Sequence, residues 1–122
     1  MADLDIDART DTDHIPWFLA GNFGPVFDEV TDVNLRVTGS IPPSLAGRYL
    51  RTGSNPPSGV SSHWFAGDGM IHAFDIENGR VAYKNRWVKT TKWELERAAG
   101  RGLFSGMNPL DADESVQGLA TN

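Results

Sequence analysis

The stretch His63-Trp64-Phe65-Ala66-Gly67-Asp68-Gly69-Met70-Ile71-His72-Ala73 (residues 63–73) decides how this chain can fold. It combines two histidines, a carboxylate, two glycines and two large aromatic residues, a mixture too costly for an ordinary loop. The glycines can supply positive φ or a close backbone approach, and the aspartate between them can accept hydrogen bonds from nearby N–H groups. We therefore predict a turn in which His63, Asp68 and His72 each make local backbone hydrogen bonds.

A metal site built from the same three side chains is the alternative interpretation, because two histidines and a carboxylate can hold a mononuclear iron. The spacing of His63 and His72 excludes the helical His-x-x-x-His zinc pattern, as do the glycines between them. Nothing in a strand–turn–strand passage directs the three side chains toward one point. From the residues alone, the structural interpretation is therefore favoured over a metal site made by His63, Asp68 and His72.

Upstream, residues 47–56 (GRYLRTGSNP) indicate a strand over residues 48–52 that runs into a rigid loop. Arg48 and Arg51 are three apart in that strand, so they face opposite sides and form no joint anion clamp. The loop, residues 53–59, contains two adjacent prolines that prevent regular structure. Further upstream, the alternation in residues 34–38 (NLRVT) predicts another half-buried strand.

Downstream, Asn78-Gly79 favours a type I′ turn between strands over residues 71–77 and 80–89. Val81, Tyr83 and Trp87 share one face of the second strand by period-two patterning. Residues 92–99 (KWELERAA) are good helix formers, and the glycines that follow at 100 and 102 give a stop signal.

Both ends of the chain have a different composition. Residues 1–21 are predicted to be an acidic, disordered arm that includes a solvated His14, and residues 22–122 to be one domain. Residues 15–27 mix aromatic residues with glycine and proline, which indicates an irregular segment that lies across an apolar surface. Residues 116–122 could begin another strand. Glu94, Glu96 and Arg97 are predicted to form a solvated helix face.

Composition excludes several classes of function. The chain has 11 basic and 16 acidic residues among 122, a net charge of −5, which disfavours nucleic acid as a partner. It has no cysteine, so disulfides and thiolate metal sites are excluded. No secretory signal or transmembrane run is present, which makes a cytoplasmic protein the default expectation.

The aromatic residues leave two interpretations open. Most simply, the tryptophans and phenylalanines form the core. Alternatively, Trp17, Phe18, Phe23 or Phe104 is exposed as part of an apolar entrance or a membrane-contacting patch.

Two of the blocks quoted above resemble the carotenoid cleavage oxygenase family. Residues 43–56 are similar to the family pattern P-x-x-L-x-G-x-y-l-R-N-G-P-N-P, and residues 63–72 to H-W-F-D-G-D-G-M-I-H, and a hairpin follows in the same place. The chain departs from the pattern at Thr52, Ser54 and Ala66. The residues that carry the resemblance as a structural motif are Gly47, Arg51, Gly53, Asn55, Pro56, His63, Trp64, Phe65, Gly67, Asp68, Gly69 and His72.

The resemblance implies an all-β fold, the N-terminal portion of a seven-bladed β-propeller with one short helix and an irregular N-terminal arm. It implies an oxidoreductase in which a single Fe(II), held by four histidines, brings dioxygen to a conjugated C=C bond of a carotenoid, apocarotenoid or stilbene. Family ligand motifs lie beyond this segment, and none of His14, His63 and His72 matches one. The resemblance therefore implies no catalytic, cofactor-binding or metal-ligating residue in this chain. The implied partners are a hydrophobic conjugated substrate and dioxygen, with peripheral membrane contact of the full-length protein as an option.

The length argues that the propeller is incomplete in this chain. At roughly 40–45 residues per blade, the chain is shorter than three blades, whereas propellers close with about four to eight. We therefore expect an N-terminal fragment of a larger enzyme that is inactive alone. The alternative is a non-catalytic β-rich binding module or an inactive remnant without a metal.

Overall fold

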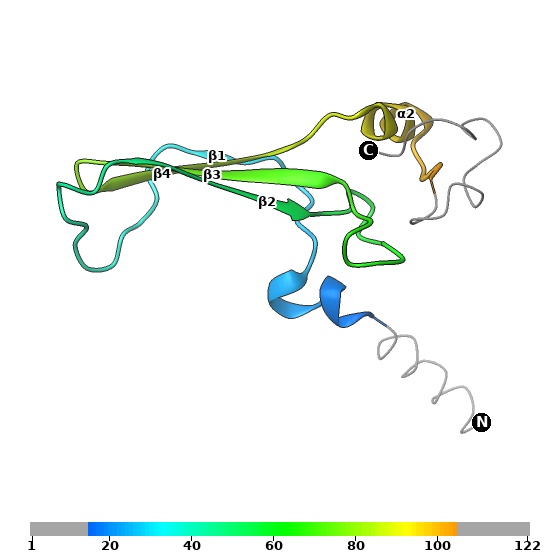
Figure 1. The fold of residues 1–122 in the computed structure, drawn as a ribbon, viewed down its shortest axis with the longest axis horizontal. Helices are drawn as coiled ribbons and strands as arrows, with labels where there is room; N and C mark the ends of the chain where they lie inside the picture. The colour runs from blue at the N-terminus through cyan, green and yellow to red at the C-terminus, as the bar shows by residue number, and fades with distance from the viewer. Residues whose placement is uncertain (1–14, 105–122) are drawn as a thin grey trace, which may run out of the picture.

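The computed structural model describes residues 15–104 as one twisted antiparallel sheet with short helical elements at one end (Figure 1). The sheet has four strands in the order β1-β4-β3-β2. The elements in chain order are η1 (Trp17–Leu19), η2 (Gly21–Phe23), β1 (Thr31–Asp32), β2 (Gly47–Ser54), β3 (Gly69–Glu77), β4 (Arg80–Trp87) and α2 (Thr91–Ala99).

The predicted hairpin is confirmed. β3 and β4 pair in antiparallel register from Met70 opposite Trp87 to Glu77 opposite Arg80. Asn78 (φ 51°) and Gly79 (φ 73°) both take left-handed conformations, as a type I′ turn requires. This turn fixes the register, because a slip by one residue would move every side chain of the hairpin to the opposite face.

The prediction of a strand over residues 34–38 is wrong. The first strand lies earlier, at Thr31–Asp32. Its position is set by tertiary contacts. The amide of Asn85 in β4 accepts a hydrogen bond from Val30 N–H and so aligns the preceding segment beside β4. After β1, the Asp32 carboxylate accepts a hydrogen bond from Asn34 N–H at 2.9 Å, an Asx turn that ends the ladder.

The strand predicted over residues 48–52 is present and longer, since β2 runs from Gly47 to Ser54. The predicted helix is also present as α2. The Thr90 hydroxyl accepts from Trp93 N–H at its start, and Gly100 closes it in a left-handed conformation (φ 70°).

The two ends of the sheet differ in burial. We name the end formed by Ser54, Gly69 and Trp87 the junction end, and the end formed by Gly47, Ile76 and Val81 the hairpin end. The buried apolar side chains are Met70, Ala73, Trp87, Leu103 and Phe104, and most of them lie toward the junction end.

The prediction that the tryptophans and phenylalanines form the core is therefore wrong for half of them. Trp17, Phe23, Phe27, Trp64 and Phe65 are all 40% exposed or more. Among the tryptophans and phenylalanines in residues 15–104, only Trp87 and Phe104 are buried. A single sheet offers too little apolar surface to cover the others.

The predicted domain division at residue 21 stays a prediction. The boundary between residues 21 and 22 falls inside η2, and neither η1 nor η2 carries a buried residue. The solvated His14, most of the acidic arm and the predicted strand at 116–122 lie outside the described residues.

Candidate functional site

Most residues of the sequence motif gather at the junction end, where four segments meet. Asn55, which is 6% exposed, makes hydrogen bonds to several of these segments. Its side-chain oxygen accepts from Val26 N–H at 2.7 Å, and its amide nitrogen donates to Val26 O at 2.8 Å. Its backbone N–H donates to Asp68 O, and its carbonyl accepts from Trp87 Nε1. One asparagine thus joins the N-terminal segment, the 63–69 turn and β4.

The turn before β3 is held by local hydrogen bonds, as predicted for His63. The His63 ring Nδ1 accepts from Phe65 N–H at 3.1 Å, and the Ser54 hydroxyl accepts from Gly67 N–H at 2.9 Å. Gly67 provides the predicted close approach, since a Cβ there would lie 2.8 Å from Pro56 Cδ. Positive φ was the other expectation for Gly67 and Gly69, and neither residue has it.

Asp68 and His72 differ from the prediction. Asp68, 2% exposed, forms an ion pair with Lys92 of α2 and accepts no backbone N–H from residues 15–104, because the helix brings a stronger donor to it. Among residues 15–104 its second oxygen, Oδ2, has no hydrogen-bond partner. His72 interacts with a side chain instead of the backbone: its Nδ1 lies 2.8 Å from the Tyr83 hydroxyl across the hairpin.

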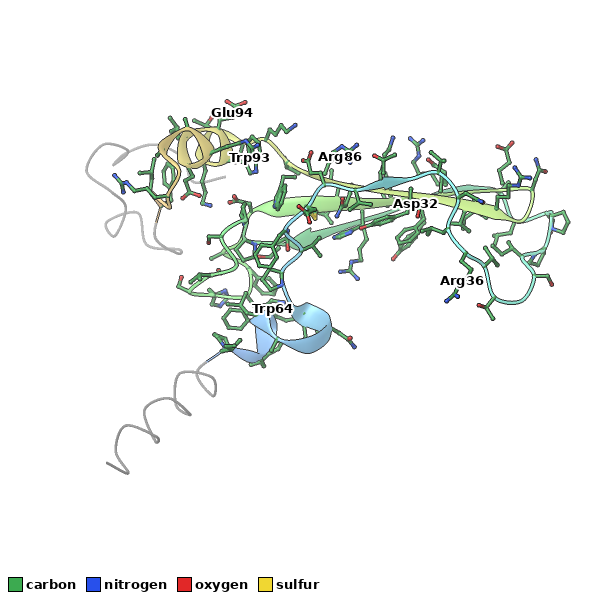
Figure 2. All side chains as sticks on the ribbon, turned by 180° about the vertical axis from the view of Figure 1, so that it is seen from behind. Asp32, Arg36, Trp64, Arg86, Trp93 and Glu94 are labelled. Atoms are coloured by element: carbon green, nitrogen blue, oxygen red, sulfur yellow. The ribbon has the colours of Figure 1, made fainter. Side chains whose placement is uncertain are left out.

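Lys92 and Glu96 complete a buried polar network that sequence analysis missed. Lys92 Nζ also contacts the Glu96 carboxylate at 3.1 Å. Glu96 Oε1 in turn accepts from the backbone N–H groups of Leu103 and Phe104, each at 3.0 Å. Glu96 therefore does not belong to a solvated helix face, although Glu94 is exposed as predicted (Figure 2). The Lys–Glu spacing of four residues was the available signal.

An aromatic cluster connects the 3-10 turns with the 63–69 turn. Trp17 contacts Phe23 and Trp64 with ring centroids 5.5 and 4.8 Å apart, and Trp64 stacks on Phe65 at 5.0 Å. Figure 2 shows Trp64 next to the 3-10 turns. Trp17 and Phe23 are 59% and 54% exposed, so the alternative of exposed aromatics holds for these two, whereas Phe104 is buried.

Two clefts border these features. One of about 800 Å³ is lined by Phe18, Phe23, Trp64 and Phe65 together with Arg51 and His72. Another of about 490 Å³ lies between α2 and the 56–67 loop and reaches Asp68, Lys92 and Glu96. The aromatic side chains of the first cleft suit the apolar part of a ligand, and its wall also carries polar residues, among them Asn22, Thr52 and Thr90.

The motif residues do not all come together. Gly47 lies at the hairpin end, where it begins β2 with a φ of 148°. Arg51 projects from the middle of β2, opposite His72. Burial, and secondarily the charge of Arg51, lower the pKa of His72 from its ordinary 6.5, so the imidazole is neutral at pH 7.

The described residues do not fit an iron site. Within residues 15–104 no group of three or more histidine, aspartate or glutamate side chains could hold a metal ion. His63, Asp68 and His72 each have a different local partner. In the same part of the chain, no helix is long and apolar enough to cross a membrane.

Comparison with known proteins gives a consistent set of matches. Residues 23–121 match the family model described as retinal pigment epithelial membrane protein. The chain is 39% identical over 95 residues to carotenoid 9,10(9',10')-cleavage dioxygenase 1 of Phaseolus vulgaris, covering 76% of this chain and 18% of that protein. It is 36% identical over 105 residues to lignostilbene-alpha,beta-dioxygenase isozyme III of Sphingomonas paucimobilis, covering 83% and 21%.

Solved structures of similarly named enzymes superpose on the chain. The crystal structure of Pseudomonas brassicacearum lignostilbene dioxygenase superposes with a TM-score of 0.78 at 24% identity, over 88% of this chain and 23% of that one. A variant of Synechocystis apocarotenoid oxygenase gives a TM-score of 0.60 at 32% identity, over 67% and 18%. The chain thus spans less than a quarter of the length of each of these proteins.

Proposed function

The chain belongs to the retinal pigment epithelial membrane protein family, that of the carotenoid cleavage oxygenases, and from this membership we propose that it is the N-terminal part of an alkene-cleaving dioxygenase. The whole enzyme would add dioxygen across a conjugated C=C bond of a carotenoid, apocarotenoid or stilbene. The C=C bond and the O–O bond break, and each carbon receives one oxygen atom, so two carbonyl products form and the atoms balance.

The observation that carries this proposal is the match over residues 23–121, which includes the whole junction end. Relatives that match the same region are named as dioxygenases of carotenoids and of lignostilbene. The aromatic side chains that line part of the cleft of about 800 Å³ support a hydrophobic substrate class.

A non-haem Fe(II) would supply the oxygen chemistry in the whole protein. Its ligands would come from outside residues 15–104, since these offer no suitable group. The described residues would have a structural role: Asn55 and Asp68 hold the turn that carries the aromatic side chains. We further propose that the sheet forms part of a β-propeller.

The second candidate is a non-catalytic β-rich module. One observation favours it: the titratable side chains of the 63–72 motif are each engaged in local structure, His63 with Phe65 N–H, Asp68 with Lys92 and His72 with Tyr83. Such engagement is what a scaffold requires and leaves none of them free for a reaction.

Iron analysis and oxygen uptake separate the two candidates. The gene is expressed together with any coding sequence that continues past Asn122, and the product is assayed with a stilbene and an apocarotenoid. One equivalent of iron with substrate-dependent oxygen uptake would support the enzyme. A product without either, well folded by circular dichroism, would support the module. The chain up to Asn122 alone is expected to bind no stoichiometric iron.

A further inference from the structure

The two faces of the sheet differ in charge. By the strand register, Arg48, Asp75, Glu77, Arg80, Lys84 and Arg86 all project from one face, which we name the charged face. The opposite face of β2–β4, which we name the apolar face, carries Tyr49, Met70, Phe74, Ile76, Val81 and Tyr83. Arg51 is the one Lys, Arg, Asp or Glu that these three strands place on the apolar face.

Arg51 has no carboxylate partner among residues 15–104, in contrast to Arg48 and Arg86 of the charged face. Arg48 donates from Nε to Asp75 at 2.5 Å, and Arg86 donates to Thr31 Oγ1 at 2.7 Å and lies 3.9 Å from Glu29. Arg51 instead lies near His72, whose pKa it helps to lower. A guanidinium on an apolar face is costly unless an anion pairs with it once it is covered.

His72 and Tyr83 add a hydrogen-bond donor beside Arg51 on the apolar face. If Nδ1 of the neutral imidazole accepts from the Tyr83 hydroxyl, Nε2 carries the proton and remains a donor. If Nδ1 donates to the hydroxyl oxygen, the Tyr83 O–H remains a donor. Either arrangement leaves one unused donor beside the five of the guanidinium, a set that an anion satisfies.

The surroundings form a trough. Arg51, His72 and Tyr83 line a cleft of about 470 Å³ whose other walls are Leu35, Tyr49 and Phe74. In both views the loop between β1 and β2 and the η1–η2 turns extend to the same side of the sheet, at its opposite ends (Figures 1 and 2). The cleft lined by Arg51, Phe18 and Phe23 places this side at the apolar face.

We propose that the trough is a docking surface for an apolar protein segment that carries one carboxylate, which pairs with Arg51 and accepts from the His72–Tyr83 pair. Charge complementarity selects this occupant. A second copy of the chain, docked face to face, would leave both Arg51 side chains unpaired, because β2–β4 place no carboxylate on the apolar face. The aromatic walls suit apolar side chains, and the donor set suits Asp or Glu.

The test measures binding of two synthetic pentapeptides, acetylated and amidated Leu-Tyr-Glu-Tyr-Leu and its Gln counterpart, to the whole ¹⁵N-labelled chain by NMR. We expect the Glu peptide to bind about fivefold more tightly, as one partly exposed charge pair provides. Shifts should concentrate on Tyr49, Arg51, His72 and Tyr83. Arg51→Gln should abolish the preference, whereas Arg48→Gln on the charged face should leave it unchanged.

Charge reversal gives a second variant in case Arg51→Gln alters the fold. Arg51→Glu should prefer a peptide with Lys at the central position over the Glu peptide. Equal binding of the Glu and Gln peptides to the unaltered chain would overturn the proposal. So would shifts confined to the charged face, competition by acetate alone at equal affinity, or a dimer in sedimentation that the Glu peptide does not dissociate.

Discussion

The junction end and the hairpin end of the sheet are built from the same three strands, yet different forces hold them. At the junction end, Asn55, Asp68 and Lys92 are buried and satisfy backbone groups and charges from four segments. At the hairpin end, Arg48 and Asp75 pair in the open, with 57% and 41% of their side chains exposed. Polar contacts therefore stabilise the junction end, because they are desolvated there. At the hairpin end, the local geometry of the turn contributes more than the exposed ion pair.

The largest expected effect comes from breaking the buried ion pair. Lys92→Met leaves the Asp68 carboxylate buried without its cation, so the free energy of unfolding should fall by about 3–5 kcal/mol. Urea denaturation followed by tryptophan fluorescence measures this fall, because Trp87 is buried at the same end.

Arg48→Met at the hairpin end is the matched control. Its pair with Asp75 is exposed, so the effect should be small and should decrease further with added salt. Equal losses in the two variants would contradict the contrast between the two ends.

Overpacking the turn should have the second-largest effect. Gly67→Ala places a Cβ 2.8 Å from Pro56 Cδ and 3.0 Å from Pro56 N, where the backbone cannot yield easily. The free energy of unfolding should fall by about 1–3 kcal/mol. Gly53→Ala, in the neighbouring strand, is the control, since its nearest atom is Arg51 Nη2 at 3.9 Å. A similar loss in both variants would show that the turn is not tightly packed.

Removing the Asn85 amide should weaken the pairing of β1 with β4. Asn85 is 1% exposed, accepts from Val30 N–H and donates to Asp28 O at 3.1 Å. Asn85→Ala leaves both groups without a partner, at a cost of about 1–3 kcal/mol. Hydrogen exchange at Val30 N–H should become faster, while exchange in the β2–β3 ladder changes less. Lys84→Ala, on the charged face, should leave the exchange at Val30 unaltered.

The smallest effect concerns pH. The pKa of His72 is lowered in the folded chain, first by burial and then by Arg51, so the unfolded chain binds a proton more readily. Stability should therefore fall as pH drops below the ordinary value of 6.5 and level off below the folded pKa. Unfolding at several pH values, with an NMR titration of the His72 ring, measures both quantities.

The variant Arg51→Gln separates the two causes of the lowered pKa of His72. It removes the secondary cause, so the pKa of His72 should rise but stay below 6.5 because burial remains. A pKa of His72 at or above 6.5 in the unaltered chain would contradict the burial argument.

Local sequence chemistry predicted the elements that depend on a few adjacent residues. Asn78-Gly79 fixed the turn and the register of β3 and β4, and Gly100 ended α2 as the stop signal predicted. Neither depends on distant contacts, because a positive φ or a cap is satisfied within one or two turns of chain. The family assignment also followed from the quoted motifs and is confirmed by the match over residues 23–121.

The site was predicted only in part. The partner of Asp68 was expected among neighbouring N–H groups, yet it is Lys92, 24 residues away. Asn85 was missed, although its place between Tyr83 and Trp87 in a period-two strand put a polar group on the inward face. That position was the available signal, since a buried amide requires partners.

The amino-acid sequence by itself determined the hairpin, the helix, the tight 63–69 turn and the family, because each depends on residue types at short spacing. Only the tertiary structure decided where β1 lies, which partner each buried polar group has, and that Arg51 lies alone on the apolar face of the sheet. These depend on contacts between residues 24 to 58 positions apart, such as Asp68 with Lys92 and Glu29 with Trp87, and no short-range pattern encodes them. The polar groups of the junction end lose their water only when its segments have come together, so no single segment reveals their partners.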